Sequence, residues 1–148
     1  MIKETLVMSN KIQILVVDDE KEILKSIERY FSFFDDVEML FASTYEQAID
    51  LMEKYHPRMY ILDINLPDGN GLKLVKIIKQ HSAANQVIMI TGASDLSRVF
   101  EALESGANDY LTKPLDMAIL RSIVSEAVER FQRWYDLIKL ELQIKQRD

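Results

Sequence analysis

The sequence contains no cysteine, and it has only four glycines, three prolines and one tryptophan among 148 residues. Without cysteine the chain can form no disulfide, and it offers no thiolate as a metal ligand or nucleophile. This composition suits a reducing compartment, so we expect a cytoplasmic protein. The first eleven residues lack an apolar run of signal-peptide length, and no later segment is apolar enough to predict a membrane span.

An excess of positive charge is also missing, because the formal net charge is −6. Sequence-independent binding to nucleic acid or to an anionic membrane needs clustered lysine and arginine, so we predict neither for this chain. Acidic patches instead attract metal cations or basic protein surfaces. Length and composition, with 48% hydrophobic and 28% charged residues, are those of one globular domain.

Apolar runs and helical patterns alternate along the chain. Runs rich in β-branched residues predict strands that are buried on both faces, as in a parallel sheet. These runs are 12–17, 37–42, 59–62, 86–90 and the weaker 108–112. Between them, apolar residues recur with helical spacing at about 23–34, 45–52, 72–78 and 96–103. Ser43 and Glu46 have the spacing of a capping box before the second of these helices.

Alternating strands and helices predict an α/β fold: a doubly wound, five-stranded parallel sheet with helices on both faces. Of the two common strand orders, five strands suit the flavodoxin-like order 2-1-3-4-5. In such sheets ligands bind beyond the carboxyl ends of the strands, next to the switch point between the first and third strands. The strand ends are therefore where we expect the functional site.

Charged and hydroxyl side chains follow four of the five predicted strands. They are Asp18 and Asp19 after the first strand, Asp63 after the third, Thr91 after the fourth and Lys113 after the fifth. Each has an ordinary structural explanation when taken alone, such as a helix cap, a turn or a solvated charge. Their joint placement at one edge of the sheet instead predicts a single polar crevice.

Three carboxylates this close would repel one another unless a cation intervened. Oxygen ligands suit Mg²⁺, which usually binds one or two carboxylates together with waters and phosphate oxygens. An aspartate can also act as a nucleophile toward a phosphoryl group. We interpret Asp63 as a phosphate acceptor, with Asp18 and Asp19 holding the metal and with Lys113 and Thr91 facing the phosphoryl oxygens.

The sequence resembles the receiver domain of bacterial two-component response regulators over about residues 11–131. The resemblance rests on VVDDE (16–20), LDINLPDGNGL (62–72), ITGAS (90–94) and DYLTKPL (109–115). It implies that Asp63 accepts a phosphoryl group from a phosphohistidine on a sensor histidine kinase or phosphotransfer protein. The reaction would need Mg²⁺ or Mn²⁺, and the domain would signal and catalyse only its own phosphotransfer and autodephosphorylation.

The resemblance also assigns individual roles. It implies metal binding by Asp19 and Asp63 directly, by Asp18 through water and by the backbone carbonyl of Asn65. Lys113 and Thr91 would contact the phosphoryl group, and the Lys113-Pro114 peptide bond would be cis. Thr91 and Tyr110 would form the switch, which would change the face made by the fourth helix, fifth strand and fifth helix.

The carboxyl-terminal part of the chain, from Leu115 to Asp148, contains neither glycine nor proline. We therefore predict a long helix in which apolar residues follow a heptad seam: Val124, Val128, Phe131, Tyr135, Ile138 and Leu142. We divide the chain into an N-terminal tail at 1–10, a receiver domain at 11–131 and a helical extension at 132–148. The extension is either a frayed end, a linker, or a signalling helix or coiled coil. A homodimer would form through it or through the switch face.

Three other functions are compatible with parts of the pattern. A phosphatase of the haloacid-dehalogenase type would use Asp18 as its nucleophile, but that family has two aspartates separated by one residue, whereas here Asp18 and Asp19 are adjacent. A nucleotide-binding Rossmann module would need a glycine-rich loop after the first strand, where this chain has acidic residues. A scaffold that has lost phosphorylation is the third possibility.

Overall fold

The computed structural model describes residues 11–92 and 97–147. The features predicted from the sequence that lie outside these residues are the N-terminal tail at 1–10, the last two residues of the ITGAS motif, the start of the fourth predicted helix at Leu96, and Asp148 at the end of the helical extension. The strands of the main sheet are β1 (Ile12–Val17), β2 (Val37–Ala42), β3 (Met59–Asp63), β6 (Gln86–Thr91) and β7 (Asp109–Thr112). A short hairpin of β4 (Asn65–Leu66) and β5 (Gly69–Asn70) follows β3.

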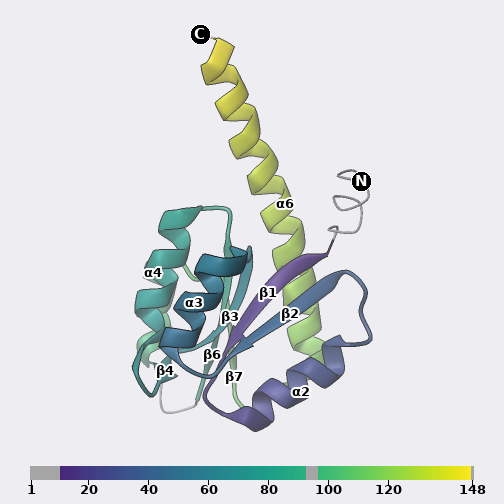
Figure 1. Cartoon of the computed structure of the whole chain (residues 1–148), viewed down its shortest axis with the longest axis vertical. Helices are drawn as coiled ribbons and strands as arrows, with labels where there is room; N and C mark the ends of the chain where they lie inside the picture. Colours follow the sequence, from purple (N-terminus) through teal and green to yellow (C-terminus); the bar gives the residue numbers. More distant parts are fainter. Residues whose placement is uncertain (1–10, 93–96, 148) are drawn as a thin grey trace.

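The five strands of the main sheet are parallel and lie in the order β2-β1-β3-β6-β7 (Figure 1). Numbered by their succession within this sheet, they have the order 2-1-3-4-5, so the predicted doubly wound, flavodoxin-like topology is confirmed. The strands β1 and β3 lie side by side, as expected at the switch point.

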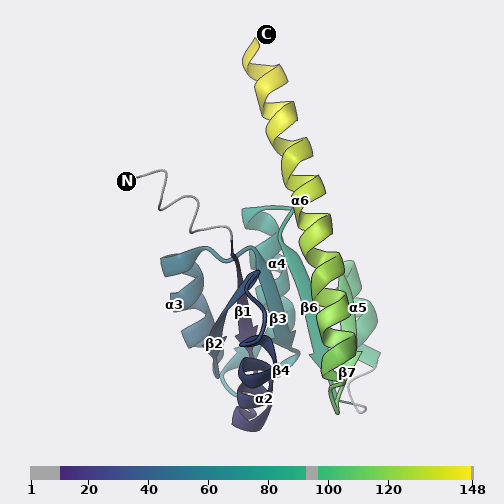
Figure 2. The same cartoon turned by 90° about the vertical axis from the view of Figure 1, so that its right-hand side faces the viewer.

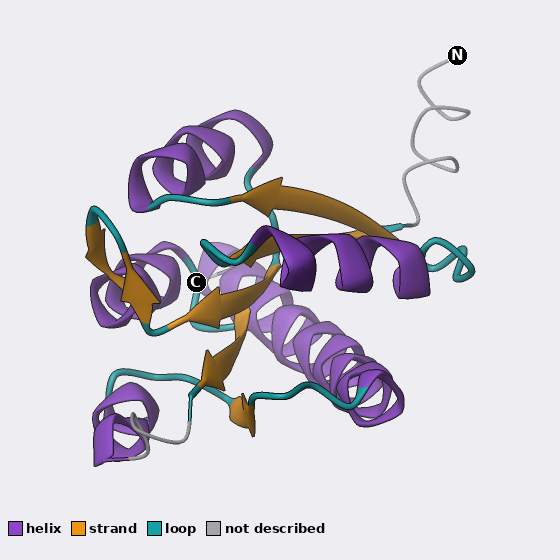
Figure 3. Ribbon diagram, turned by 90° about the horizontal axis from the view of Figure 1, so that it is seen from below, coloured by secondary structure: helices purple, strands orange, loops and turns teal. Residues whose placement is uncertain are grey.

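The helices are α2 (Lys21–Phe31), α3 (Tyr45–Tyr55), α4 (Gly71–His81), α5 (Val99–Glu104) and α6 (Met117–Arg147). They cover the two faces of the sheet, as the view along it in Figure 3 makes clear. Core residues of α3, α4 and α5 pack on one face, and those of α2 and α6 pack on the other. This is the layering that right-handed crossovers between parallel strands produce.

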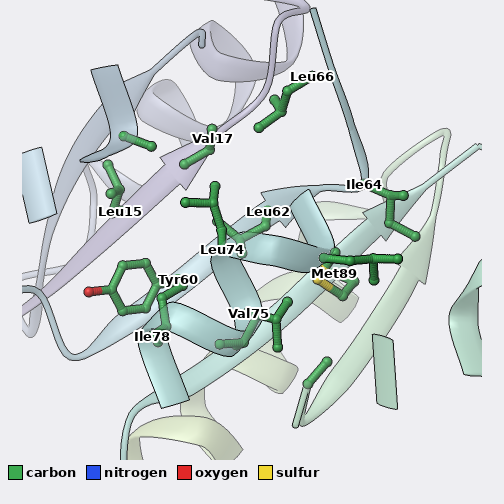
Figure 4. Close-up of a cluster of buried hydrophobic side chains, with 14 of the residues drawn as sticks. Leu15, Val17, Tyr60, Leu62, Ile64, Leu66, Leu74, Val75, Ile78 and Met89 are labelled. Carbon is green, nitrogen blue, oxygen red and sulfur yellow. The ribbon is translucent and has the colours of Figure 1, made fainter. Parts of the chain in front are cut away.

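The strands supply apolar side chains to both faces because successive residues of a strand point in opposite directions. In β1, Leu15 and Val17 belong to the core under α3 and α4, whereas Ile14 and Val16 belong to the core under α2 and α6. Figure 4 shows part of the first core, where Leu74 and Val75 of α4 lie near Leu62. All of these side chains are fully buried, which explains the unbroken apolar runs in the sequence.

The helix α6 has a packed half and a projecting half. Leu120, Val124, Ala127 and Phe131 are buried against the sheet, and beyond them the helix extends away from the domain (Figures 1 and 2). Between Gln132 and Arg147 the least exposed residue is Tyr135, and its ring stacks on that of Phe131 with centroids 5.3 Å apart. None of the described helices combines the length and the apolar character that a bilayer span requires.

Candidate functional site

Strand register brings the predicted site residues to one edge of the sheet. Val17, just before Asp18, pairs with Leu62, just before Asp63. In turn, Asp63 pairs with Ile90, which precedes Thr91. The backbone N–H of Lys113 then donates to the carbonyl oxygen of Thr91 at 2.8 Å, which continues the β6–β7 ladder by one residue. Each side chain therefore lies at or just beyond the carboxyl end of its strand, next to the end of a neighbouring strand.

The ammonium group of Lys113 lies at the centre of the site. Its Nζ is 3.2 Å from Asp18 Oδ2, 3.1 Å from Asp63 Oδ2 and 2.9 Å from Glu20 Oε1. One lysine thus joins the ends of β1 and β3 to the loop after β7. The part played by Glu20 was not predicted from the sequence, although its position directly after the acidic pair was a visible signal.

Backbone amides hold two of the carboxylates in place. The N–H of Glu20 donates to Asp18 Oδ1 at 2.8 Å, and the N–H of Asn65 donates to Asp63 Oδ1 at 3.1 Å. The backbone at Gly71 also lies very close to the backbone of Asp63. A Cβ at position 71 would collide with the carbonyl oxygen of Asp63. Glycine at position 71 therefore allows the hairpin to close tightly behind Asp63.

The electrostatics of the site are unfavourable for the carboxylate of Asp18. This side chain is fully buried, and burial raises its pKa to about 6, with the nearby charge of Asp63 adding to the effect. The amide of Glu20 and the ammonium of Lys113 oppose this shift only in part. For Lys113, burial lowers the pKa, but hydrogen bonds to Glu20 and Asp63 together with the charges of Asp18 and Asp63 outweigh burial and leave the pKa above its ordinary value.

The donor set fits a hard divalent cation. Oxygen atoms of Asp18, Asp19 and Asp63 all lie within 4.8 Å of one another, and Asp19 is exposed to solvent, from which an ion can enter. The buried Asp18 Oδ2 has no hydrogen-bond partner among the described residues and is balanced only by the ion pair with Lys113. A cation bound to these oxygens would relieve the repulsion that raises the pKa of Asp18.

Three further residues were assigned roles by the family resemblance: Thr91, Tyr110 and Pro114. Thr91 is fully buried at the end of β6, and its Oγ1 has no hydrogen-bond partner within the described parts of the chain. Tyr110 lies on the edge strand β7 with 42% of its surface exposed. The Lys113-Pro114 peptide bond is cis.

A second cation lies beside the hairpin that follows Asp63. Arg98, which directly precedes α5, donates from Nη1 to Asn65 Oδ1 at 2.6 Å and from Nη2 to Asn70 Oδ1 at 3.1 Å. Nothing in the sequence pattern singled out Arg98, because its partners lie 33 and 28 residues earlier in the chain.

Comparison with known proteins agrees with this arrangement. The family model described as "Response regulator receiver domain" matches residues 14–125, which is most of the chain. The chain belongs to the response regulator receiver domain family. The family resemblance inferred from the sequence is thereby confirmed.

Curated relatives include the regulatory protein AtoC of Escherichia coli, which is 32% identical over 79% of this chain and 25% of its own length. The transcriptional regulatory protein MalR of Bacillus subtilis is 31% identical over 78% of this chain and 49% of its own length. This chain thus spans between about a quarter and a half of the length of these relatives.

Solved receiver domains superpose on most of the chain. The signal receiver domain of a LuxO repressor protein from Vibrio parahaemolyticus has a TM-score of 0.78 at 25% identity and covers 86% of this chain and 97% of its own. The BeF3-activated receiver domain of DrrB has a TM-score of 0.70 at 33% identity and covers 80% of this chain and 98% of its own.

Proposed function

We propose that this receiver domain is switched by phosphorylation of Asp63. The observation that supports this proposal is the contact of the single Lys113 ammonium with both Asp18 and Asp63, together with the buried hydroxyl of Thr91, which has no hydrogen-bond partner among the described residues. A phosphoryl group carries negative charge and several hydrogen-bond acceptors. The ammonium can neutralise the charge, and both the ammonium and the hydroxyl can donate hydrogen bonds to the acceptors.

In the proposed reaction, an Asp63 carboxylate oxygen forms a bond to phosphorus as the bond from phosphorus to the donor imidazole nitrogen breaks. Lys113 neutralises charge on the transferred group, and the Thr91 hydroxyl donates to one of its oxygens. Asp18, Asp19, Asp63 and the backbone carbonyl of Asn65 would hold Mg²⁺ or Mn²⁺. When bound, the metal ion supplies positive charge that offsets the carboxylates and the phosphoryl oxygens.

The proposed partner is a sensor histidine kinase or a phosphotransfer protein, and the proposed location is the cytoplasm. The chain would act as a signalling domain whose only catalysis is its own phosphotransfer and dephosphorylation. The net charge of −6 supports the absence of direct nucleic-acid binding by this chain. The lack of cysteine supports a reducing compartment.

Replacing the acceptor tests this proposal. We expect Asp63→Asn to abolish phosphate incorporation from acetyl phosphate and Mg²⁺, as measured by intact-protein mass spectrometry, because an amide cannot form the acyl phosphate. Asp50→Asn is the matched control, because Asp50 is exposed on α3, and it should be phosphorylated like the wild type. Phosphate on the Asp63→Asn protein, or its loss only in Asp18→Asn, would favour the phosphatase-like alternative.

We further propose that the projecting half of α6 pairs with a second copy of the chain. Phe131, Tyr135, Ile138 and Leu142 continue, at spacings of 4, 3 and 4, the seam that buries Val124 in the domain core. Ile138 and Leu142 are 36% and 55% exposed, so this continuation of the core seam faces solvent in the single chain. A second copy presents the same seam and can cover it symmetrically.

Light scattering of charged variants tests the dimer. We expect Ile138→Lys with Leu142→Lys to shift the mass toward the monomer, because lysines in the seam would repel across the interface. Leu140→Lys is the control, since Leu140 is 52% exposed but lies about 200° around the helix from both seam residues. If the Ile138→Lys, Leu142→Lys protein remained a dimer, the interface would not be the α6 seam. The α5–β7–α6 face, where Phe100 is 74% exposed, would then be the candidate interface.

A further inference from the structure

The guanidinium of Arg98 fastens the start of α5 to the hairpin beside the acceptor. Its two nitrogens donate to the side-chain oxygens of Asn65 and Asn70, which pair with each other across β4 and β5. The planar fork of an arginine can hold two such oxygens at once, which a lysine cannot do in the same geometry. The bond to Asn65 is short at 2.6 Å, as expected for a charge-assisted hydrogen bond.

Both asparagines are fixed at a second point. The backbone N–H of Asn65 donates to Asp63 Oδ1 at 3.1 Å, so this residue contacts the acceptor directly. The side chain of Asn70 caps α4 by accepting from the N–H of Leu72 at 2.8 Å. Arg98 is therefore connected to the Asp63 carboxylate through Asn65 and is anchored to the first turn of α4 through Asn70.

The hydrogen-bond partners of Arg98 among the described residues are neutral. Within residues 11–92 and 97–147 its guanidinium forms no salt bridge, whereas Lys113 forms three at the acidic cluster. Its guanidinium instead donates to the two side-chain amide oxygens of the hairpin. A charged side chain that binds two neutral amides beside a reactive carboxylate is suited to position those amides.

We propose that Arg98 is a positioning residue that prolongs the life of the phosphorylated state by restraining the Asn65 side chain. This inference rests on the proposed phosphorylation of Asp63. In hydrolysis, a water oxygen forms a bond to phosphorus, the bond from phosphorus to Asp63 breaks, the carboxylate leaves, and the water protons pass to phosphate and solvent. While Arg98 holds Asn65 Oδ1, this acceptor is directed to the guanidinium and not to the attacking water.

The test is the rate of phosphate loss after acetyl phosphate is removed in the presence of Mg²⁺, followed by intact-protein mass spectrometry. We expect Arg98→Ala to lose phosphate about tenfold faster than the wild type, the size of one charge-assisted hydrogen bond. Arg133→Ala, which removes an exposed arginine from α6, is the matched control and should not change the rate. An equal or slower rate in Arg98→Ala overturns the proposal.

Two further comparisons separate positioning from charge or altered folding. In an Asn65→Ala background, Arg98→Ala should have no additional effect, because the restrained side chain is gone; a full effect there overturns the proposal. Arg98→Lys keeps the positive charge but loses the two-nitrogen geometry of the guanidinium, so this variant should also lose phosphate faster than the wild type. A wild-type rate in Arg98→Lys would mean that the charge of Arg98, and not its geometry, sets the phosphate lifetime. Phosphate absent from all proteins would overturn the proposed function as well, whereas equal lifetimes overturn only the role of Arg98.

Discussion

The two ends of strand β6 bury polar side chains to the same extent, but they differ in how many hydrogen-bond partners these side chains have. Gln86 at the start and Thr91 at the end are both fully shielded from solvent. Gln86 accepts from Arg130 Nη1 at 3.0 Å and donates to the carbonyl of Ala84 at 3.0 Å. Thr91 Oγ1 has no partner among the described residues.

The same difference extends to the neighbouring charges. At the carboxyl end of the sheet, Asp18, which follows β1, is fully buried with a pKa raised to about 6. At the start of β6, the ammonium of Lys79 is also desolvated, which lowers its pKa to about 8, but it donates to the carbonyls of Asn85 and Ala83. Hydrogen bonding at the amino end is incomplete at one atom, because Asn85 Oδ1 lacks a partner within the described chain.

This contrast indicates that the buried polar groups at the amino end of β6 serve stability, whereas those at its carboxyl end serve function. Buried polar groups that are hydrogen-bonded contribute to the native state, whereas buried groups left without partners cost stability and are tolerated where chemistry needs them. Among the described residues, Asp18 Oδ2 and Thr91 Oγ1 lack hydrogen-bond partners at the carboxyl end of the sheet, and this is the end at which a cation and a phosphoryl group would bind.

The largest stability effect is expected at the amino end. Gln86→Met should lower the free energy of unfolding by about 1–3 kcal/mol, because it leaves the Arg130 guanidinium and the Ala84 carbonyl without their partner. Urea denaturation followed by circular dichroism measures this change. Gln80→Met, on the exposed side of α4, is the control and should stay within about 0.5 kcal/mol of the wild type.

A change of the opposite sign is expected at the carboxyl end. In EDTA, Asp18→Asn should raise the free energy of unfolding by about 1 kcal/mol, because it removes a buried charge beside Asp63 while Lys113 keeps its contacts with Asp63 and Glu20. Mg²⁺ should then stabilise the wild type but not the variant. Asp19→Asn, at an exposed position, should change the stability in EDTA by less. A less stable Asp18→Asn protein in EDTA would contradict our account of the site.

Much of the fold was predictable because the central strands β1, β3 and β6 lie between two apolar layers. The alternation of Leu15 and Val16 between opposite cores requires an unbroken apolar run, and parallel topology then sends every strand end to one edge. Local capping was less predictable: Thr44, and not Ser43, caps α3, since either hydroxyl can serve when the chain enters the helix one residue later.

Contacts that depend on side-chain direction were not predictable. The ion pair of Glu20 with Lys113 and the two bonds of Arg98 join segments far apart in the chain, and nothing in local periodicity encodes them. The exposure of Phe100 on α5 was not predictable for a related reason: helical spacing identifies an apolar stripe but does not say how much of it reaches the sheet.

The smallest stability effect is expected for Thr91→Val, which replaces a hydroxyl that has no partner in the described part of the chain by a methyl group of similar size. The free energy of unfolding should change by no more than about 0.5 kcal/mol, because no hydrogen bond is lost. Thr44→Val is the matched comparison and should cost about 1 kcal/mol, because Thr44 Oγ1 accepts from the N–H of Gln47 at the start of α3. Urea denaturation of both variants measures the difference. A large loss in Thr91→Val would mean that its hydroxyl is already satisfied in the resting domain, and the contrast between the two ends of β6 would then fail.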